Sequence, residues 1–215
     1  MDRRFRLIPS IASADQLHLA DEIEKVREWP WLHIDIEDGN FVPNITFGEK
    51  TVRAIASAAP QELDVHLLTN DPGAYLPLLG ECGVKRAAAH LEALPYPLEF
   101  LNRVRDMGME AGLALNFLTP AESISLFSGS LDYVIVMTAE PDRKGQQFYA
   151  PILRKIRALR GLLPPEVSIW ADGGINSGNM DLVKEAGADT LIMGRCVFGT
   201  SDPLLTLRTL SETKN

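Results

Sequence analysis

The chain has 215 residues, of which 46% are hydrophobic and 23% charged, an ordinary composition for a globular protein. Its formal net charge of -8 argues against nucleic acid or an anionic membrane as a partner, because such partners require a basic face. The two cysteines, Cys82 and Cys196, are far apart and outside any CxxC pattern, so we expect a reducing, cytoplasmic compartment. The N-terminus lacks the apolar run of a signal peptide, and no run of about 18 apolar residues predicts a membrane span.

Short apolar runs alternate with helical patterns along the chain. The apolar runs predict buried strands at residues 7–10, 32–36, 63–68, 86–90, 110–116, 133–138, 167–171 and 190–193. Helical patterns follow at residues 15–28, 49–58, 73–81, 97–106, from 120 onward with Thr119 as the cap, and at 151–162, 179–185 and 203–212. Eight strand–helix units, spaced roughly 25 to 30 residues apart, predict a (β/α)8 TIM barrel.

The predicted fold is a single α/β barrel domain over residues 1–215. Runs such as Tyr133 to Met137 are apolar throughout, as parallel strands buried on both faces require. No linker or low-complexity segment interrupts the series, so we expect no second domain. A doubly wound open sheet is the competing architecture.

Polar side chains occupy the predicted C-terminal strand ends, where barrel enzymes hold their catalytic groups. His33 and Asp35 alternate along one strand and therefore face the same side. With His66 and Asp172 they offer two imidazoles and two carboxylates, which suit Zn²⁺, Fe²⁺, Mn²⁺ or Co²⁺. The competing interpretation is that the histidines are core residues and the aspartates cap loops. Convergence of all four at one end of the barrel favours the metal site, and Asp64, deeper on the same face, is interpreted as structural.

Asp35 and Asp172 lie on well-separated predicted strands, so they can face a bound substrate from opposite sides. One carboxylate removes a proton and the other delivers one, which inverts a carbon centre; each such group contributes about 10²–10⁴-fold in rate. A divalent metal bridging adjacent carbonyl and hydroxyl oxygens would stabilise the enediolate between the two steps.

Glycines follow the last two predicted strands, at Gly173-Gly174 and at Gly194, and Arg195 comes next. Barrels commonly bind phosphate here, because backbone amides and a short helix N-terminus face the ligand. Glycines are also common as turn residues. The pattern indicates an anion site because it occurs at both strand ends together.

These motifs together resemble the ribulose-phosphate 3-epimerase family over nearly the whole chain. The matching stretches occur in order: Pro9 to Asp15, His33 to Ile36 with Asp38-Gly39 and Phe41 to Asn44, Leu63 to Leu67, Ala114 to Asn116 with Thr119-Pro120, Val136-Met137, Gly145-Gln146 with Phe148, and Ala171 to Asn176. The resemblance implies a TIM barrel of the ribulose-phosphate-binding type and one divalent metal ion held by His33, Asp35, His66 and Asp172. It also implies that Asp35 and Asp172 move the C3 proton of a phosphorylated ketose through an enediolate, and that the protein forms a homo-oligomer.

The resemblance also implies which residues bind the substrate. Ser10 and His66 would contact the sugar. The phosphate would be held by Asp142, Arg143, Lys144, Gly145, Gly173, Gly174, Gly194 and Arg195.

Several positions depart from the family pattern. Glu37 and Leu68 stand where the family has methionine. In the family, methionine side chains form an apolar cover over the intermediate, and of these only Met137 is present here. Glu140 replaces the asparagine before a proline, and Arg195 replaces a small residue. In these features the chain resembles a divergent branch of sugar-phosphate epimerases more than the housekeeping pentose enzyme.

The phosphate loop departs most, because the family's Gly-Phe-Gly-Gly reads Asp142 to Gly145 here. Arg143, Lys144 or Arg195 would replace lost amide contacts with charged contacts to a phosphate. Alternatively, the loop accommodates another head group, and Glu37 meets a polar feature of another sugar. A third interpretation is that Arg143 and Lys144 are solvated loop charges.

The leading functional hypothesis is a metal-dependent 3-epimerase of a pentose 5-phosphate or of a hexulose 6-phosphate such as allulose 6-phosphate. The second is a barrel aldolase or decarboxylase, whose Asp-x-Lys-x-x-Asp motif has no counterpart in His33 to Asp38, which contains no lysine. The third is a catalytically retired barrel that binds a sugar phosphate as a sensor, which the altered loop leaves open.

Overall fold

The computed structural model describes residues 5–141 and 145–212. Within these residues, eight parallel strands form one sheet: β1 (Arg6–Pro9), β2 (Trp31–Glu37), β3 (Glu62–Leu68), β4 (Arg86–His90), β5 (Glu110–Leu115), β6 (Tyr133–Met137), β7 (Ser168–Asp172) and β8 (Thr190–Met193). The strand order is β1-β8-β7-β6-β5-β4-β3-β2, and a parallel bridge between Ser10 and His33 joins the two ends of this series. The predicted TIM barrel is confirmed, and the doubly wound open sheet is wrong.

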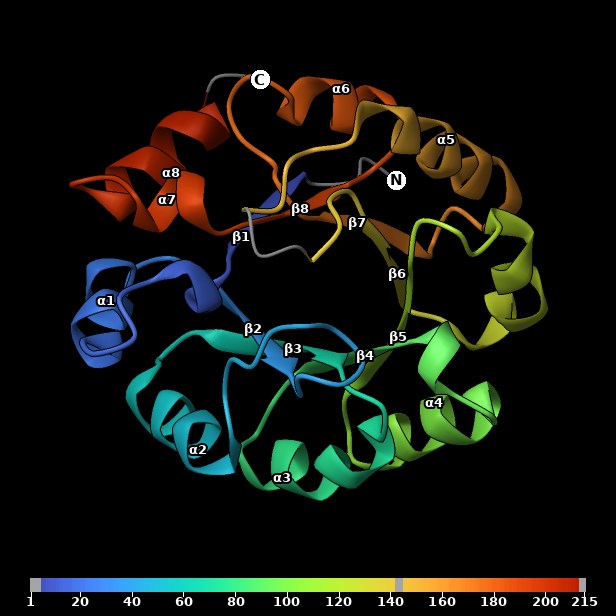
Figure 1. The fold of residues 1–215 in the computed structure, drawn as a ribbon, viewed down its shortest axis with the longest axis horizontal. Coiled ribbons are helices and arrows are strands. Elements are labelled where there is room, and N and C mark those ends of the chain that lie inside the picture. Colours follow the sequence, from blue (N-terminus) through green and yellow to red (C-terminus); the bar gives the residue numbers. More distant parts are fainter. Residues whose placement is uncertain (1–4, 142–144, 213–215) are drawn as a thin grey trace.

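The helices form a ring outside the strands (Figure 1). They are α1 (Leu19–Lys25), α2 (Glu49–Ala58), α3 (Leu76–Glu81), α4 (Pro97–Asp106), α5 (Leu153–Leu162), α6 (Met180–Glu185), α7 (Arg195–Phe198) and α8 (Pro203–Glu212). Short 3₁₀ segments lie at η1 (Ile11–Ser13), η2 (Pro72–Tyr75), η3 (Leu91–Ala93), η4 (Ala121–Ser130) and η5 (Ala150–Ile152). None of the helices in the described ranges is long and apolar enough to cross a bilayer.

The predicted helices 73–81 and 151–162 begin as the 3₁₀ segments η2 and η5, and two other predicted helices differ more from the structure. The segment after β5 is the 3₁₀ segment η4, and the Thr119 hydroxyl donates to the Glu92 carboxylate instead of capping a helix. The helix predicted over residues 15–28 is limited to α1, because the Asp15 carboxylate accepts the Leu17 amide at 2.9 Å and holds a turn before it.

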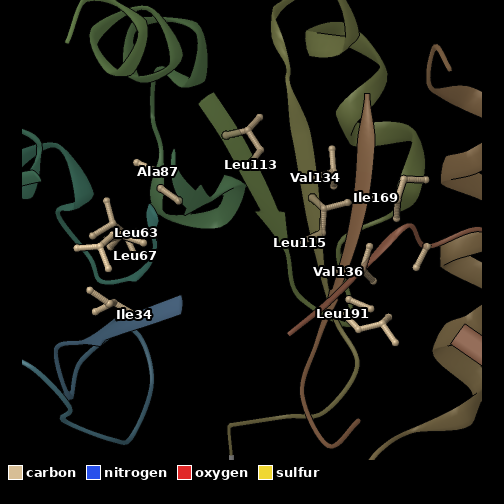
Figure 2. Packing of buried hydrophobic residues seen from close by; sticks show 14 of the residues in the cluster. Ile34, Leu63, Leu67, Ala87, Leu113, Leu115, Val134, Val136, Ile169 and Leu191 are labelled. Atoms are coloured by element: carbon tan, nitrogen blue, oxygen red, sulfur yellow. The ribbon is translucent and has the colours of Figure 1, made fainter. Parts of the chain in front are cut away.

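Two layers of buried side chains flank the strands because successive residues point to opposite faces. The outward-facing residues pack between barrel and helices, and Figure 2 labels Ile34, Leu63, Leu67, Ala87, Leu113, Leu115, Val134, Val136, Ile169 and Leu191 from this layer. Inside the barrel, the Tyr133 and Trp170 rings stack with centroids 4.4 Å apart. A Cβ atom on Gly112 would lie 2.5 Å from Tyr133 Cζ, so only glycine fits there. This interior forms a packed base beneath the C-terminal strand ends.

The opposite end of the barrel is closed by a charged cluster. The Arg86 guanidinium lies 3.7 Å from the centroid of the Trp31 ring and donates to the carboxylates of Glu110 at 3.0 Å and Glu62 at 3.2 Å. The Arg86 side chain is 7% exposed, so this plug leaves the C-terminal end as the open face of the barrel.

Candidate active site

The four side chains expected to bind a metal lie together at the C-terminal end of the barrel. Each offers a ligand atom within 4.8 Å of the others. His33 Nε2 lies 2.9 Å from Asp35 Oδ1, while His66 Nδ1 lies 3.4 Å from Asp35 Oδ1 and 3.3 Å from Asp172 Oδ2. Both histidines are fully buried, whereas the two aspartate side chains are 14% exposed, so the carboxylates form the accessible surface of the cluster.

The strands explain this convergence. Asp35 on β2 is the register partner of His66 on the neighbouring β3, and His33 precedes Asp35 by two residues on the same face. Asp172 is the last residue of β7, which β8 and β1 separate from β2. Carboxylates from separate strands therefore approach the same point from different directions.

Buried hydrogen bonds hold the ligand side chains. The Ser10 hydroxyl donates to Asp35 Oδ2 at 2.7 Å, and His33 Nδ1 bonds to Asp64, which is 1% exposed. His66 Nε2 lies 3.0 Å from His90 Nε2. In both histidines, the nitrogen that faces away from Asp35 and Asp172 has a partner, and the other nitrogen points into the cluster.

The two aspartates have pKa values shifted in opposite directions. Burial raises the pKa of Asp35, but the His33 charge and hydrogen bonds from both imidazoles outweigh burial and lower it. For Asp172, burial and the nearby Asp35 charge raise the pKa above its ordinary value. Burial lowers the pKa of His33 and His66, and the adjacent carboxylates reverse this effect and raise both above the ordinary value. The neighbouring groups therefore act in opposite directions on the two carboxyl groups.

The donor set suits a divalent cation. Two carboxylates that share a buried site repel each other unless a positive charge lies between them. Two imidazole nitrogens and two carboxylate oxygens match the preferences of Zn²⁺, Fe²⁺, Mn²⁺ and Co²⁺. The hydrogen bonds of the outer ring nitrogens fit this role, since metal-binding histidines usually donate their other N–H to a neighbouring group.

A cavity of about 630 Å³ opens above the two aspartates. Its lining includes Ser10, Asp35, Glu37, Met137, Gly145, Asp172, Gly173, Gly174, Gly194 and Arg195. His66 is expected to contact substrate, and it lies fully buried beneath this lining. Asp142, Arg143 and Lys144 lie outside the described residues.

The glycine-rich end of the cavity is tightly packed. A Cβ on Gly174, at φ +67°, would lie 2.5 Å from the Phe148 amide nitrogen, so glycine lets the loop after β7 approach the loop after β6. Arg195, the first residue of α7, extends across the same gap and donates through Nη2 to the Gln146 carbonyl at 3.0 Å. The expected phosphate-binding residues Gly145, Gly173, Gly174, Gly194 and Arg195 thus share one end of the cavity.

Glu37 is a third carboxyl group in the cavity. It is the last residue of β2, faces the same side as Asp35, and is 7% exposed. Burial, together with the charges of Asp35 and Asp172, raises the pKa of Glu37 to about 7. A carboxyl group therefore stands at one position of the apolar cover that the family resemblance leads one to expect, while Leu68 and Met137 still line the cavity.

His90 and Glu92 lie next to the cluster, and the sequence motifs did not single them out. His90 ends β4, faces the barrel interior and is fully buried, and burial lowers its pKa to about 4. Glu92 lies two residues later, and its Oε2 is 3.2 Å from His90 Nδ1. The sequence signal that could have indicated this pair is a histidine at a strand end followed two residues later by a carboxylate.

Comparison with known proteins assigns the family. Residues 6–198 match the Ribulose-phosphate 3 epimerase family. The chain belongs to the ribulose-phosphate 3-epimerase family. Among its relatives, the ribulose-phosphate 3-epimerase of Bacillus subtilis is 36% identical over 92% of this chain and 94% of its own length. That of Rhodobacter capsulatus is 37% identical over 92% of this chain and 87% of its own length. Membership of the ribulose-phosphate 3-epimerase family identifies the chain as an isomerase of the epimerase type.

Solved structures with low sequence identity share the barrel. An orotidine 5′-phosphate decarboxylase from Pyrococcus horikoshii aligns with a TM-score of 0.69 at 14% identity, over 96% of this chain and 97% of its own. A thiamine phosphate pyrophosphorylase from Pyrococcus furiosus aligns with a TM-score of 0.64 at 16% identity, over 98% and 96%. These similarities show that the chain shares the fold of the two proteins.

Proposed function

We propose that the chain is a metal-dependent 3-epimerase that inverts C3 of a phosphorylated ketose. The observation that carries the proposal is the pair Asp35 and Asp172, which come from separate strands, share one cluster and both line the cavity. An ionised carboxylate takes the C3 proton, and a protonated carboxyl group delivers one to the opposite face, which inverts the carbon. The reverse reaction exchanges the two roles.

The surrounding residues assist this proton transfer. When bound by His33, Asp35, His66 and Asp172, a divalent cation supplies positive charge beside the substrate oxygens that become negative as C3 loses its proton. Ser10 holds the Asp35 carboxylate through its hydroxyl, so that carboxylate keeps one orientation. Removal of a carbon-bound proton needs both the base and this charge stabilisation.

The substrate class follows from the family and the cavity. The curated relatives carry the name ribulose-phosphate 3-epimerase, which supports a pentose 5-phosphate as substrate. Arg195 and the glycines after β7 and β8 would hold the phosphate, with the Arg195 guanidinium supplying charged hydrogen bonds. Glu37 at the cavity wall makes a hexulose 6-phosphate such as allulose 6-phosphate the alternative, because a longer sugar has more hydroxyl groups for a carboxyl group to bind.

The proposal is tested by proton exchange. The protein, loaded separately with Zn²⁺, Fe²⁺, Mn²⁺ or Co²⁺, is incubated in D₂O with a panel of ketose 5- and 6-phosphates. We expect deuterium at C3 and formation of the C3 epimer for at least one substrate, and no exchange after the metal is removed. Binding of these sugars without any exchange at C3 would refute epimerisation and support a sugar-phosphate-binding protein.

A further inference from the structure

His90 is a buried histidine that the proposed proton transfer does not use. Its Nε2 lies 3.0 Å from His66 Nε2, the two rings stack with centroids 4.9 Å apart, and the Phe41 ring covers His90 at a centroid distance of 4.8 Å. Two imidazole nitrogens at this separation share a single proton, because one must donate and the other must accept. The direction of this hydrogen bond decides which nitrogen of His66 is free.

Glu92 defines that direction. Its Oε1 accepts the Asn116 amide at 2.9 Å and the Thr119 hydroxyl, and its Oε2 lies 3.2 Å from His90 Nδ1. Burial raises the pKa of Glu92, but these hydrogen bonds outweigh burial and lower it to about 2, so the group is an ionised acceptor. The proton between His90 and Glu92 therefore belongs to His90 Nδ1.

The hydrogen bonds then run in one direction. A neutral imidazole carries one ring proton, and when that proton is on Nδ1 of His90, Nε2 is bare and accepts. His66 must then donate from its own Nε2. With its proton on Nε2, a neutral His66 leaves the lone pair of Nδ1, which lies 3.4 Å from Asp35 and 3.3 Å from Asp172, for a cation bound between these groups.

We infer that His90 and Glu92 are positioning residues whose hydrogen bonds fix the ring proton of His66 on Nε2 and leave Nδ1 available to bind the metal. The inference rests on the metal centre proposed above. Asp64 would do the same for His33 with the opposite nitrogen, since it bonds to Nδ1 and leaves Nε2 facing Asp35. Two ligand histidines on neighbouring strands are therefore held in opposite tautomers by different partners.

The tautomers are measured directly on the wild-type chain. Protein labelled with ¹⁵N-histidine is loaded with Zn²⁺, and long-range ¹H–¹⁵N spectra report which nitrogen of each ring is protonated. We expect the proton on Nε2 in His66 and on Nδ1 in His90. A proton on Nε2 of His90 would overturn the inference. If Zn²⁺ does not bind the wild-type chain at all, the proposed metal centre fails, and the role of His90 and Glu92 fails with it.

Metal affinity tests the same inference without substrate. The Kd for Zn²⁺, measured by competition with a chelator, should rise about 10–100-fold in His90→Leu and in Glu92→Ala, the usual cost of losing a hydrogen-bond partner of a ligand histidine. His90→Gln should recover part of the loss, because its carboxamide oxygen can accept from His66 Nε2. Glu99→Gln is the matched control, since Glu99 is on α4 with 61% of its side chain exposed, and should keep the wild-type Kd.

Folding is checked in the same samples by circular dichroism and by the thermal midpoint of unfolding. A purely structural role predicts lower midpoints and an unchanged Kd for Zn²⁺. A folded Glu92→Ala protein whose Kd equals that of the wild type would therefore overturn the inference.

Discussion

Replacing Asp172 with asparagine separates proton transfer from folding and metal binding. Asparagine has nearly the same shape and keeps a carbonyl oxygen for a cation, but it cannot exchange a proton with carbon. A positioned acid or base contributes about 10²–10⁴-fold in rate. At about 1.36 kcal/mol for each tenfold change, Asp172→Asn should raise the activation free energy by about 2.7–5.4 kcal/mol.

Asp172 is a cleaner target than Asp35 because of their neighbours. Asp35 also accepts the Ser10 hydroxyl and lies 2.9 Å from His33 Nε2, so its replacement disturbs those contacts as well. The assay follows deuterium entry at C3 of a turned-over ketose phosphate in D₂O, with metal content measured on the same samples. Asp106→Asn, on the exposed end of α4, is the control. If Asp172→Asn binds metal and still exchanges the C3 hydrogen at the wild-type rate, the two-carboxylate assignment is wrong.

Three further results are expected. Arg195→Ala should raise KM for a phosphorylated ketose more than for the unphosphorylated sugar; equal effects would remove Arg195 from the phosphate site. Gly112→Ala should lower the free energy of unfolding by about 1–3 kcal/mol in urea titrations, because its Cβ would lie 2.5 Å from the buried Tyr133 ring, whereas Gly129→Ala, with no atom within 4 Å, should not. Burial raises the pKa of Glu92, but its hydrogen bonds outweigh burial and lower it from 4.5 to about 2. The ionised Glu92 therefore stabilises the folded chain above pH 4.5, and this contribution is lost as the pH falls towards 2. The difference in free energy of unfolding between wild type and Glu92→Gln should shrink over that range, and a constant difference would contradict this.

Strand periodicity predicted the barrel because its signal is local. The predicted strand ranges 86–90 and 190–193 coincide with β4 and β8, where polar residues bound short apolar runs. The segment after β5 was misassigned because the partner of Thr119 is distant in the chain. The Thr119 hydroxyl bonds to Glu92, 27 residues earlier, and a local capping rule does not include that partner.

The convergence of His33, Asp35, His66 and Asp172 could be predicted because strand alternation and barrel topology together bring them to one point. His33 and Asp35 share a face by simple alternation, and any residue at a strand end of this fold lies at the same mouth. The contact between Glu92 and His90 could not be predicted in this way. It follows the strand end, in the 3₁₀ segment η3, and its contact with His90 depends on how that loop turns.

The pairing of β1 with β2, which closes the barrel, lies at the candidate active site. The bridge between Ser10 and His33 joins β1 to β2, and the same two residues contact Asp35. A fluctuation that opens the sheet at this seam would therefore also separate His33 from its neighbours in the candidate metal site. Because a ligand that binds only the closed form suppresses opening, metal loading should slow amide hydrogen exchange along β1 and β2 more than in the strands opposite. A bound cation would then stabilise the closed barrel as well as take part in its chemistry.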